Sequence, residues 1–355
     1  MDSAISAAHI LASKHIPFCL YRLPGNEDKR IAIDSEVAGP HLIRRFVVRP
    51  FSEESAAEPL VYTAMSRQNL NSDFIEYLKT CRNRIPISYL SFPLETSKSE
   101  YLQGIRAYLD EIAKGVLKKA IYSRVIYADK PTEFNPIECF LHLCETFPNA
   151  FVHLLSDPRK GNWLGASPEL LIKRQGNNVT TVALAGSQAL QASGEYIWRE
   201  KELEEHLLVG RHIEQVFADC DLRLLKKNGP FTIEAGTVAH LKTEYLFEAT
   251  REHNMESLIA KLHPTPAVGG TPVAEGLACI SRYEPYDRQY YCGIIGEVNS
   301  EEDVSLYVNL RCMHVGENKI AIYAGGGITA NSDPEEEWLE TILKSRTMAD
   351  NINPR

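Results

Sequence analysis

The sequence lacks the patterns that mark several large classes of protein. It has no run of about 18 apolar residues, so we expect no membrane-spanning helix. It has no Gly-x-Ser-x-Gly elbow, no His-Glu-x-x-His helix, no P-loop and no Gly-x-Gly-x-x-Gly signature. Its 8 cysteines include no Cys-x-x-Cys pair, which argues against a disulfide framework or a zinc knuckle. These absences indicate a protein with reduced thiols, and we expect a cytoplasmic location.

Lysine and arginine are outnumbered by aspartate and glutamate, 38 to 47. The formal net charge of the 355 residues is −9, which argues against nucleic acid or an anionic membrane surface as a partner. The first residues have an acid at Asp2 and no unbroken apolar stretch, so no signal peptide is predicted. Hydrophobic residues make up 44% and charged residues 24%, the composition of a globular chain with a sizeable core. Oligomeric state cannot be predicted from these numbers, and a monomer is the default expectation.

Strand-like segments outnumber helical ones along the chain, and no internal repeat is present. Some strands follow one another directly, which favours an α+β fold with antiparallel pairing over a doubly wound nucleotide-binding fold. Apolar periodicity predicts helices near 99–117 and 196–219, and a further helix begins near Asp333. The predicted strands are 120–127, 150–155, 178–184, 304–312 and 319–324.

Two Glu-x-x-Glu pairs lie on predicted helices. A spacing of three puts Glu202 and Glu205 on one face of the first helix, and this face continues into the apolar stripe that begins at Val209. Glu337 and Glu340 share a face of the second helix. Buried like charges are costly unless a cation neutralises them, and carboxylates without His or Cys partners favour Mg²⁺. A pair of solvated glutamates on an acidic helix is the alternative for each pair alone.

Several further side chains are candidates for chemistry. Lys119 stands at the start of a predicted strand and Glu169 follows a Ser-Pro turn, so the two are a potential base and acid if burial shifts their pKa values toward neutrality. Arg311, in a predicted strand, suits bidentate binding of a carboxylate. Three glycines at 325–327 end another strand and suit either an anion-binding nest or a plain turn. Each feature alone also has an ordinary structural explanation, such as a solvated lysine or an ion-paired arginine.

Taken together, the chain resembles the chorismate-utilising enzymes over residues 97–350. Several ordered strings carry the resemblance, and their order is more specific than any single motif. The strings are KAIYSR, LGASPELL, VALAGS, KELEEH, HLKT, LHPTPAVGG, EPYDRQYYCGIIGEV, LRCM and YAGGGITANSDPEEEWLETILK. The resemblance implies one large domain of two stacked antiparallel sheets surrounded by helices. Residues 1–95 would be a divergent part of that fold and residues 96–352 the chorismate-binding catalytic region.

The resemblance also implies roles for individual residues. Glu205 and Glu340 would bind Mg²⁺ directly or through water, supported by Glu202 and Glu337, and the metal would hold the ring carboxylate of chorismate. His263 is included among the implied substrate-binding residues because it lies in the string LHPTPAVGG. No second histidine stands at metal-ligand spacing, and a role in the core or in a loop suits His263 as well. The implied substrate-binding residues are Ala185, Gly186, Ser187, His263, Thr265, Arg311, Tyr323, Gly325, Gly326, Gly327 and Lys344.

Two positions indicate which reaction of this family to expect. Water-adding members resemble this chain in having a lysine where Lys119 stands, whereas ammonia-adding members usually have glutamine. Aminodeoxychorismate synthases often have a nucleophilic lysine where this chain has Ala185. The resemblance therefore favours isochorismate synthase, which needs no amidotransferase partner, with Lys119 as base and Glu169 as acid. Salicylate synthase, which also eliminates pyruvate, and a catalytically silent chorismate-binding homologue are the alternatives. A product destined for menaquinone or for a siderophore is equally consistent with the sequence.

Overall fold

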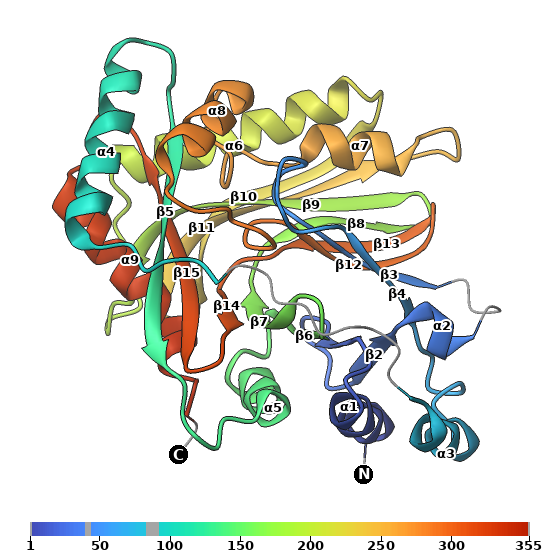
Figure 1. The fold of residues 1–355 in the computed structure, drawn as a ribbon. Coiled ribbons are helices and arrows are strands. Elements are labelled where there is room, and N and C mark those ends of the chain that lie inside the picture. Colours follow the sequence, from blue (N-terminus) through green and yellow to red (C-terminus); the bar gives the residue numbers. More distant parts are fainter. Residues whose placement is uncertain (1, 40–43, 83–91, 354–355) are drawn as a thin grey trace.

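Antiparallel strands form the centre of the protein, seen in a computed structural model that describes residues 2–39, 44–82 and 92–353. Within these residues, hydrogen bonds link the strands into one sheet with the order β10-β11-β9-β8-β13-β12-β3-β4-β2-β1-β6-β7-β14-β15-β5. Every recorded pairing between strands is antiparallel (Figure 1). The α+β fold with antiparallel pairing that the sequence predicts is therefore confirmed.

The strands vary from short central segments to the long strands near the two ends of the sheet. Their bounds are β1 Phe18–Arg22, β2 Lys29–Ile33, β3 Arg45–Arg49, β4 Leu60–Ala64, β5 Ala120–Asp129, β6 Phe151–Asp157, β7 Gly161–Ser167, β8 Leu170–Gln175, β9 Asn178–Ala189, β10 Arg223–Ala235, β11 Val238–Glu248, β12 Ile294–Ser300, β13 Asp303–Val308, β14 Cys312–Val315 and β15 Lys319–Ile328.

The two halves of this sheet pack face to face. Phe151 of β6 stacks on Tyr307 of β13 with ring centroids 4.4 Å apart, although six other strand pairings separate these strands along the sheet. Ser167 at the end of β7 also donates a hydrogen bond to the carbonyl of Val308 at the end of β13. The two stacked sheets expected from the sequence are thus two halves of one continuous sheet, because the N-terminal strands bridge them.

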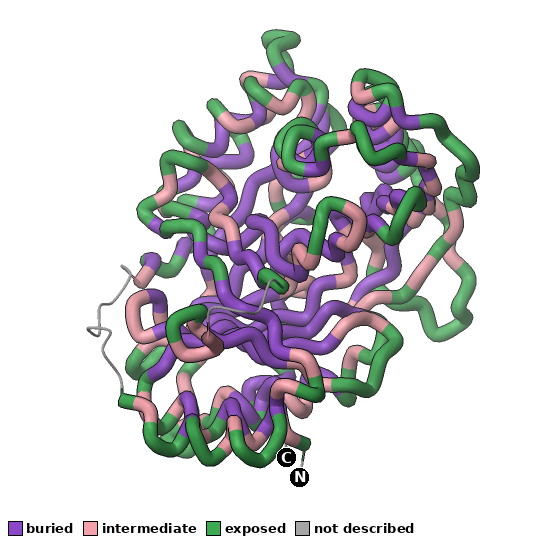
Figure 2. Tube along the Cα trace, turned by 90° about the vertical axis from the view of Figure 1, so that its right-hand side faces the viewer, coloured by how far each residue is buried: buried purple, intermediate pink, exposed green. Residues whose placement is uncertain are grey.

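Helices cover the outer surfaces of the sheet (Figure 1). Their bounds are α1 Ser3–Ser13, α2 Ser35–Ala38, α3 Ser72–Thr80, α4 Lys98–Ala113, α5 Pro136–Thr146, α6 Glu200–Ala218, α7 Met255–Leu262, α8 Val273–Tyr283 and α9 Pro334–Ala349. Helix α6 packs on β9 and β11, while α9 packs on β15 and β5. Buried residues concentrate in the central strands and exposed residues on the outer faces of the helices (Figure 2). No helix in the described ranges is long and apolar enough to cross a membrane.

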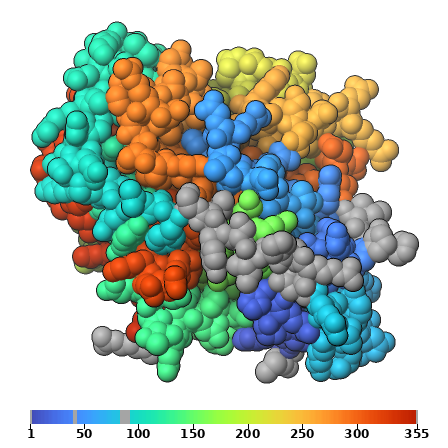
Figure 3. Space-filling model, in the orientation of Figure 1, coloured from blue at the N-terminus to red at the C-terminus, as the bar shows by residue number. Residues whose placement is uncertain are grey.

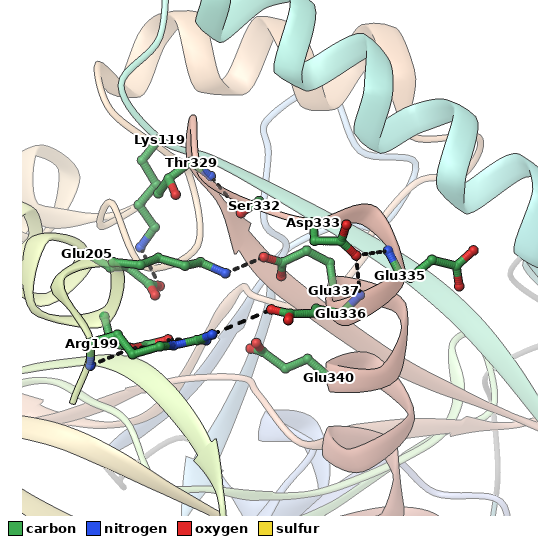
Figure 4. A network of polar contacts seen from close by, with 12 residues as sticks. Lys119, Arg199, Glu205, Thr329, Ser332, Asp333, Glu335, Glu336, Glu337 and Glu340 are labelled. Carbon is green, nitrogen blue, oxygen red and sulfur yellow. Dashed lines mark hydrogen bonds and ion pairs between the residues drawn. The ribbon is translucent and has the colours of Figure 1, made fainter. Parts of the chain in front are cut away.

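Local sequence explains the helices that support the site. The stripe Val209, Ile213 and Val216 of α6 is buried, and Glu202 at its start is buried as well. Asp333 caps α9 by accepting hydrogen bonds from two backbone amides of the first turn, and a proline follows it. Glu205 of α6 lies across from Glu337 and Glu340 of α9 (Figure 4).

The predicted strand 304–312 is wrong in its second half. Strand β13 ends at Val308 and β14 begins at Cys312. Arg311 has a φ of 48°, which a strand does not allow, and its carbonyl accepts a hydrogen bond from the amide of Ala166. The chain therefore turns at this point, and the other four predicted strands correspond to β5, β6, β9 and β15.

The described N-terminal residues are part of the same sheet. Strands β1 to β4 lie between β12 and β6 in the strand order. A loop after β3 also reaches the C-terminal third, where Ser55 and the amide of Ala56 hydrogen-bond the Asp287 carboxylate. In the space-filling view, the blue N-terminal region lies directly against the orange region that contains α7 and α8 (Figure 3). A boundary at residue 95 stays a prediction.

Candidate active site

A cavity lies where the end of β9, the C-terminal half of β15 and the first turns of α6 meet. Its wall combines charged groups with apolar side chains, as in most small-molecule sites. The residues that line it are Ile121, Pro168, Glu169, Leu184, Ala185, Gly186, Ser187, Glu205, His240, Ala267, Val268, Tyr291, Cys292, Leu310, Arg311, Tyr323, Ala324, Gly325, Gly326, Gly327 and Lys344. Most of the substrate-binding residues predicted from the sequence are among them.

Glu169 presents a buried carboxyl group to this cavity. It follows β7 in the turn predicted from the sequence, and its amide hydrogen-bonds the Ser167 hydroxyl at 3.3 Å. Its carbonyl accepts a hydrogen bond from the amide of Val308 at 3.1 Å. Burial raises the pKa of Glu169 to about 7, although the positive charge of Lys119 opposes that shift. The group therefore has a substantial neutral fraction near pH 7, as a general acid requires.

Lys119 lies just before β5 and is fully buried. Its backbone pairs with Thr271 through an isolated bridge, in which the amide of Thr271 donates to the carbonyl of Lys119 at 2.8 Å. Its ammonium nitrogen is 2.9 Å from Glu205 Oε1. Although burial opposes ionisation of Glu205, the pKa of this carboxyl is lowered by Lys119, Lys344 and Lys201. Glu205 is therefore a carboxylate, and Lys119 is its counter-ion in this state.

Each of the four predicted metal-binding glutamates has a basic partner, and Figure 4 shows the pair of Lys119 and Glu205. The pairs are Glu202 with Arg199 at 2.6 Å, Glu205 with Lys119 at 2.9 Å, Glu337 with Lys201, and Glu340 with Lys344 at 2.6 Å. In the part of the chain that the structure describes, no three acidic, His or Cys groups form a metal-binding cluster. The four carboxylates are thus paired with basic side chains, and their role as Mg²⁺ ligands stays a prediction.

Glu337 is the most buried of these carboxylates, with 1% of the residue exposed. Burial and the neighbouring Glu340 raise its pKa, while Lys201 opposes them. Its Oε2 atom is buried without a hydrogen-bond partner among the described residues. Lys201 lines an open groove beside the cavity together with Glu337 and Glu340. The sequence-based reasoning missed Lys201, although it stands directly before Glu202 in KELEEH.

The three glycines of β15 serve a different purpose from the one expected. Residues 325–327 pair in register with 121–123 of β5, so they form neither a turn nor a nest. A Cβ atom on Gly327 would lie 2.6 Å from Glu205 Oε1 and 2.9 Å from Lys119 Cε. A Cβ atom on Gly326 would lie 2.9 Å from Glu337 Oε2. A side chain at either position would therefore displace the charged groups that approach this strand from both helices.

Arg311 projects into the cavity from the turn between β13 and β14. One of its terminal nitrogens donates to the carbonyl of Lys344 and to Thr347 Oγ1, both at 3.2 Å. The other is 3.1 Å from Nε2 of His240. Burial lowers the pKa of Arg311 to about 10, although Tyr291 and Glu340 oppose the shift, so the guanidinium is charged near neutral pH.

His240 is a cavity residue that the sequence analysis left out of the substrate-binding set. Its Nδ1 is 2.9 Å from the carbonyl of Gly186, so we assign the proton to Nδ1. Nε2 then accepts a hydrogen bond from Arg311. Burial, Arg311 and Lys344 lower the pKa of His240 to about 3, so the ring is neutral. The string HLKT contained this residue, but a single histidine carries no signal of its position.

His263 and Thr265 are not among the residues that line the cavity, and their role in substrate binding stays a prediction. His263 ends α7, and its Nε2 is 2.8 Å from the carbonyl of Cys292, behind the cavity wall. The carbonyl of Thr265 accepts hydrogen bonds from the amides of Val268 and Gly269. Both residues shape the loop 264–270, and Ala267 and Val268 of this loop form the wall instead.

Comparison with known proteins identifies the family of this chain. The family model described as "Chorismate binding enzyme" matches residues 53–353. The chain belongs to this family. Isochorismate synthase DhbC of Bacillus subtilis is 31% identical over 265 residues, which are 70% of this chain and 66% of that protein. Isochorismate synthase EntC of Escherichia coli is 35% identical over 196 residues, which are 53% of this chain and 50% of that protein.

A solved structure supports the same fold. The structure of MenF, the menaquinone-specific isochorismate synthase of Escherichia coli, superposes with a TM-score of 0.77. The superposition covers 99% of this chain and 91% of MenF, at 22% sequence identity. The matched segments cover 66% of DhbC and 50% of EntC. This chorismate binding enzyme therefore matches between half and two thirds of the length of each relative.

Proposed function

We propose that this chorismate binding enzyme is an isochorismate synthase, an isomerase that adds water at C2 of chorismate and removes the C4 hydroxyl. The observation that carries the proposal is the buried Glu169 carboxyl group, whose pKa of about 7 suits an acid, in a cavity whose lining residue Glu205 is ion-paired with Lys119. The similarity to DhbC and EntC supports the same activity. Whether the product serves menaquinone or siderophore synthesis depends on the enzyme that consumes it.

The proposed mechanism uses one proton transfer at each end of the reaction. Lys119, in its neutral form, accepts a proton from the attacking water through Nζ as the water oxygen bonds to C2. The ring double bonds shift, the bond from C4 to its hydroxyl breaks, and the carboxyl group of Glu169 donates its proton to the departing oxygen. One water enters and one leaves, so chorismate and isochorismate are isomers and no oxidant is needed.

Substrate binding is assigned to the basic and apolar groups of the cavity. Arg311 and Lys344 are the positive groups for the carboxylates of chorismate, and Tyr323 and the backbone around Gly326 complete this side. Because His240, Thr347 and the carbonyl of Lys344 hold the guanidinium of Arg311 in place, little rotamer entropy is lost when a carboxylate binds. These local positive charges draw a dianion into a protein of net charge −9.

The carboxylates of α6 and α9 fit a Mg²⁺ ion. Glu205 and Glu340 would hold it directly or through water, with Glu202 and Glu337 in support. The unpartnered Oε2 atom of Glu337 and the raised pKa of this group indicate a need for more positive charge than Lys201 supplies. When bound, Mg²⁺ would hold the ring carboxylate of chorismate and neutralise its charge.

The decisive experiment incubates the purified protein with chorismate and Mg²⁺, with and without a chelator, and separates the products by chromatography. Isochorismate without pyruvate supports the proposal. Release of pyruvate would identify salicylate synthase activity, anthranilate formed from ammonium salts would identify an amine-adding enzyme, and binding without turnover would identify a silent homologue. The proposal also includes a cytoplasmic monomer that needs no amidotransferase, and light scattering of the purified protein tests the oligomeric state.

A further inference from the structure

A buried ion pair that the proposed mechanism does not use lies behind the cavity wall. Glu284 follows the last turn of α8, and Arg288 is four residues further on. Their side chains are 0% and 1% exposed, and Arg288 donates to both carboxylate oxygens of Glu284, at 2.6 and 2.7 Å. A buried ion pair adds little stability compared with apolar residues of the same size, so its presence calls for another explanation.

The pair connects two parts of the cavity wall that come from distant segments. Arg288 donates to the carbonyl of Val268 at 2.9 Å and to the carbonyl of Ile121 at 3.2 Å. Val268 and Ile121 both line the cavity, the first from the loop 264–272 and the second from β5. Glu284 in turn accepts hydrogen bonds from the amide and hydroxyl of Ser123, both at 2.8 Å. One guanidinium thus holds the loop and the strand at a fixed separation.

The position of Lys119 depends on this separation. Lys119 lies one residue before β5, beyond the ladder that joins β5 to β15. Its backbone pairs with Thr271, at the end of the loop that Arg288 holds through Val268. A loop that moved away from β5 would take the Thr271 bridge with it and change where the ammonium nitrogen of Lys119 stands.

We propose that Glu284 and Arg288 are positioning residues, which set the placement of Lys119 and of the adjoining wall by fixing the loop 264–272 against β5. This inference rests on the proposed function. The carboxylate-binding groups Arg311 and Lys344 come from the turn after β13 and from α9, and among the described residues no hydrogen bond joins either group to the pair. Loss of the pair therefore affects turnover more than substrate binding.

The test compares Arg288→Lys with a matched control in the full-length protein. Lysine keeps the charge but cannot donate to Glu284, Val268 and Ile121 together. Arg22 is the control because it is equally buried and donates to the carbonyls of Phe147, Pro148 and Ala150, none of which lines the cavity. Steady-state kinetics with chorismate and Mg²⁺, thermal unfolding, and hydrogen exchange by mass spectrometry are measured for both variants.

We expect Arg288→Lys to lower kcat by about 10- to 100-fold while KM changes by less than about threefold. Hydrogen exchange should become faster selectively in peptides covering 118–123 and 264–272. Arg22→Lys should lower the unfolding temperature without changing kcat. Equal kcat values for the two variants, or a rise in KM with kcat unchanged, would overturn the proposal, because either result leaves Lys119 correctly placed.

A second variant covers the case in which Arg288→Lys does not fold. Ser123→Ala removes one hydrogen bond to Glu284 and should lower kcat in the same direction by a smaller factor, with KM unchanged. Unchanged kcat in this variant would then count against the proposal. If the wild-type protein does not convert chorismate at all, the proposed function fails, and the exchange data still decide whether the pair holds the loop against β5.

Discussion

Replacement of Glu169 by glutamine tests the central feature of the site. Burial raises the pKa of this carboxyl from 4.5 to about 7. Between pH 4.5 and about pH 7, the folded protein therefore keeps a proton on Glu169 that the unfolded chain releases. The free energy of unfolding falls as the pH rises through this range. Since each pH unit corresponds to 1.36 kcal/mol, the full cost of ionising Glu169 in the folded protein is roughly 3 kcal/mol, reached above pH 7.

Glutamine is neutral at every pH, so Glu169→Gln should remove this cost. Between pH 5 and pH 8, the free energy of unfolding of the variant should rise relative to wild type by roughly 2 to 3 kcal/mol, measured by urea denaturation at both pH values. The same variant should lose about 10²- to 10⁴-fold in kcat, because its amide cannot donate an acidic proton.

The exposed residue Glu53 provides the control, since Glu53→Gln should change neither the activity nor the pH dependence of stability. A stability difference between wild type and Glu169→Gln that is the same at pH 5 and pH 8 would refute the raised pKa. Full activity of the variant would refute the role as acid.

Five further perturbations test other parts of the site. Lys119→Ala should abolish isochorismate formation while calorimetry still detects substrate binding, and retained activity would exclude Lys119 as the base. A chelator should stop turnover and added Mg²⁺ should restore it. In Glu337→Gln, about tenfold more Mg²⁺ should be needed to raise the unfolding temperature as far as in the wild-type protein. Gly327→Ala should cost roughly 1 to 3 kcal/mol in urea unfolding and lower kcat, because its methyl group would meet Glu205 Oε1. Arg311→Lys should raise KM by about tenfold or more with a smaller change in kcat, and an unchanged KM would remove it from the substrate-binding set.

Much of the fold and part of the site could be predicted from the sequence. The Glu pairs of α6 and α9, the turn before Glu169 and the strand after Lys119 all lie where local patterns indicated. Helical spacing placed Glu202 on the buried face of α6, because side-chain direction repeats with the helix whatever surrounds it. The order of the motifs was then enough to indicate the family, because several short strings in one order rarely occur together by chance.

The tertiary structure decided the features that depend on contacts between distant segments. Local sequence does not show that Lys201 neutralises Glu337, that His240 holds Arg311, or that Arg311 sits in a turn. The positions of His263 and Thr265 outside the cavity lining have the same origin, since a polar residue in a loop can face the cavity or the protein behind it. Periodicity along one segment determines which face of that segment is buried, whereas the partner that meets this face is set by how the halves of the sheet and the helices pack together.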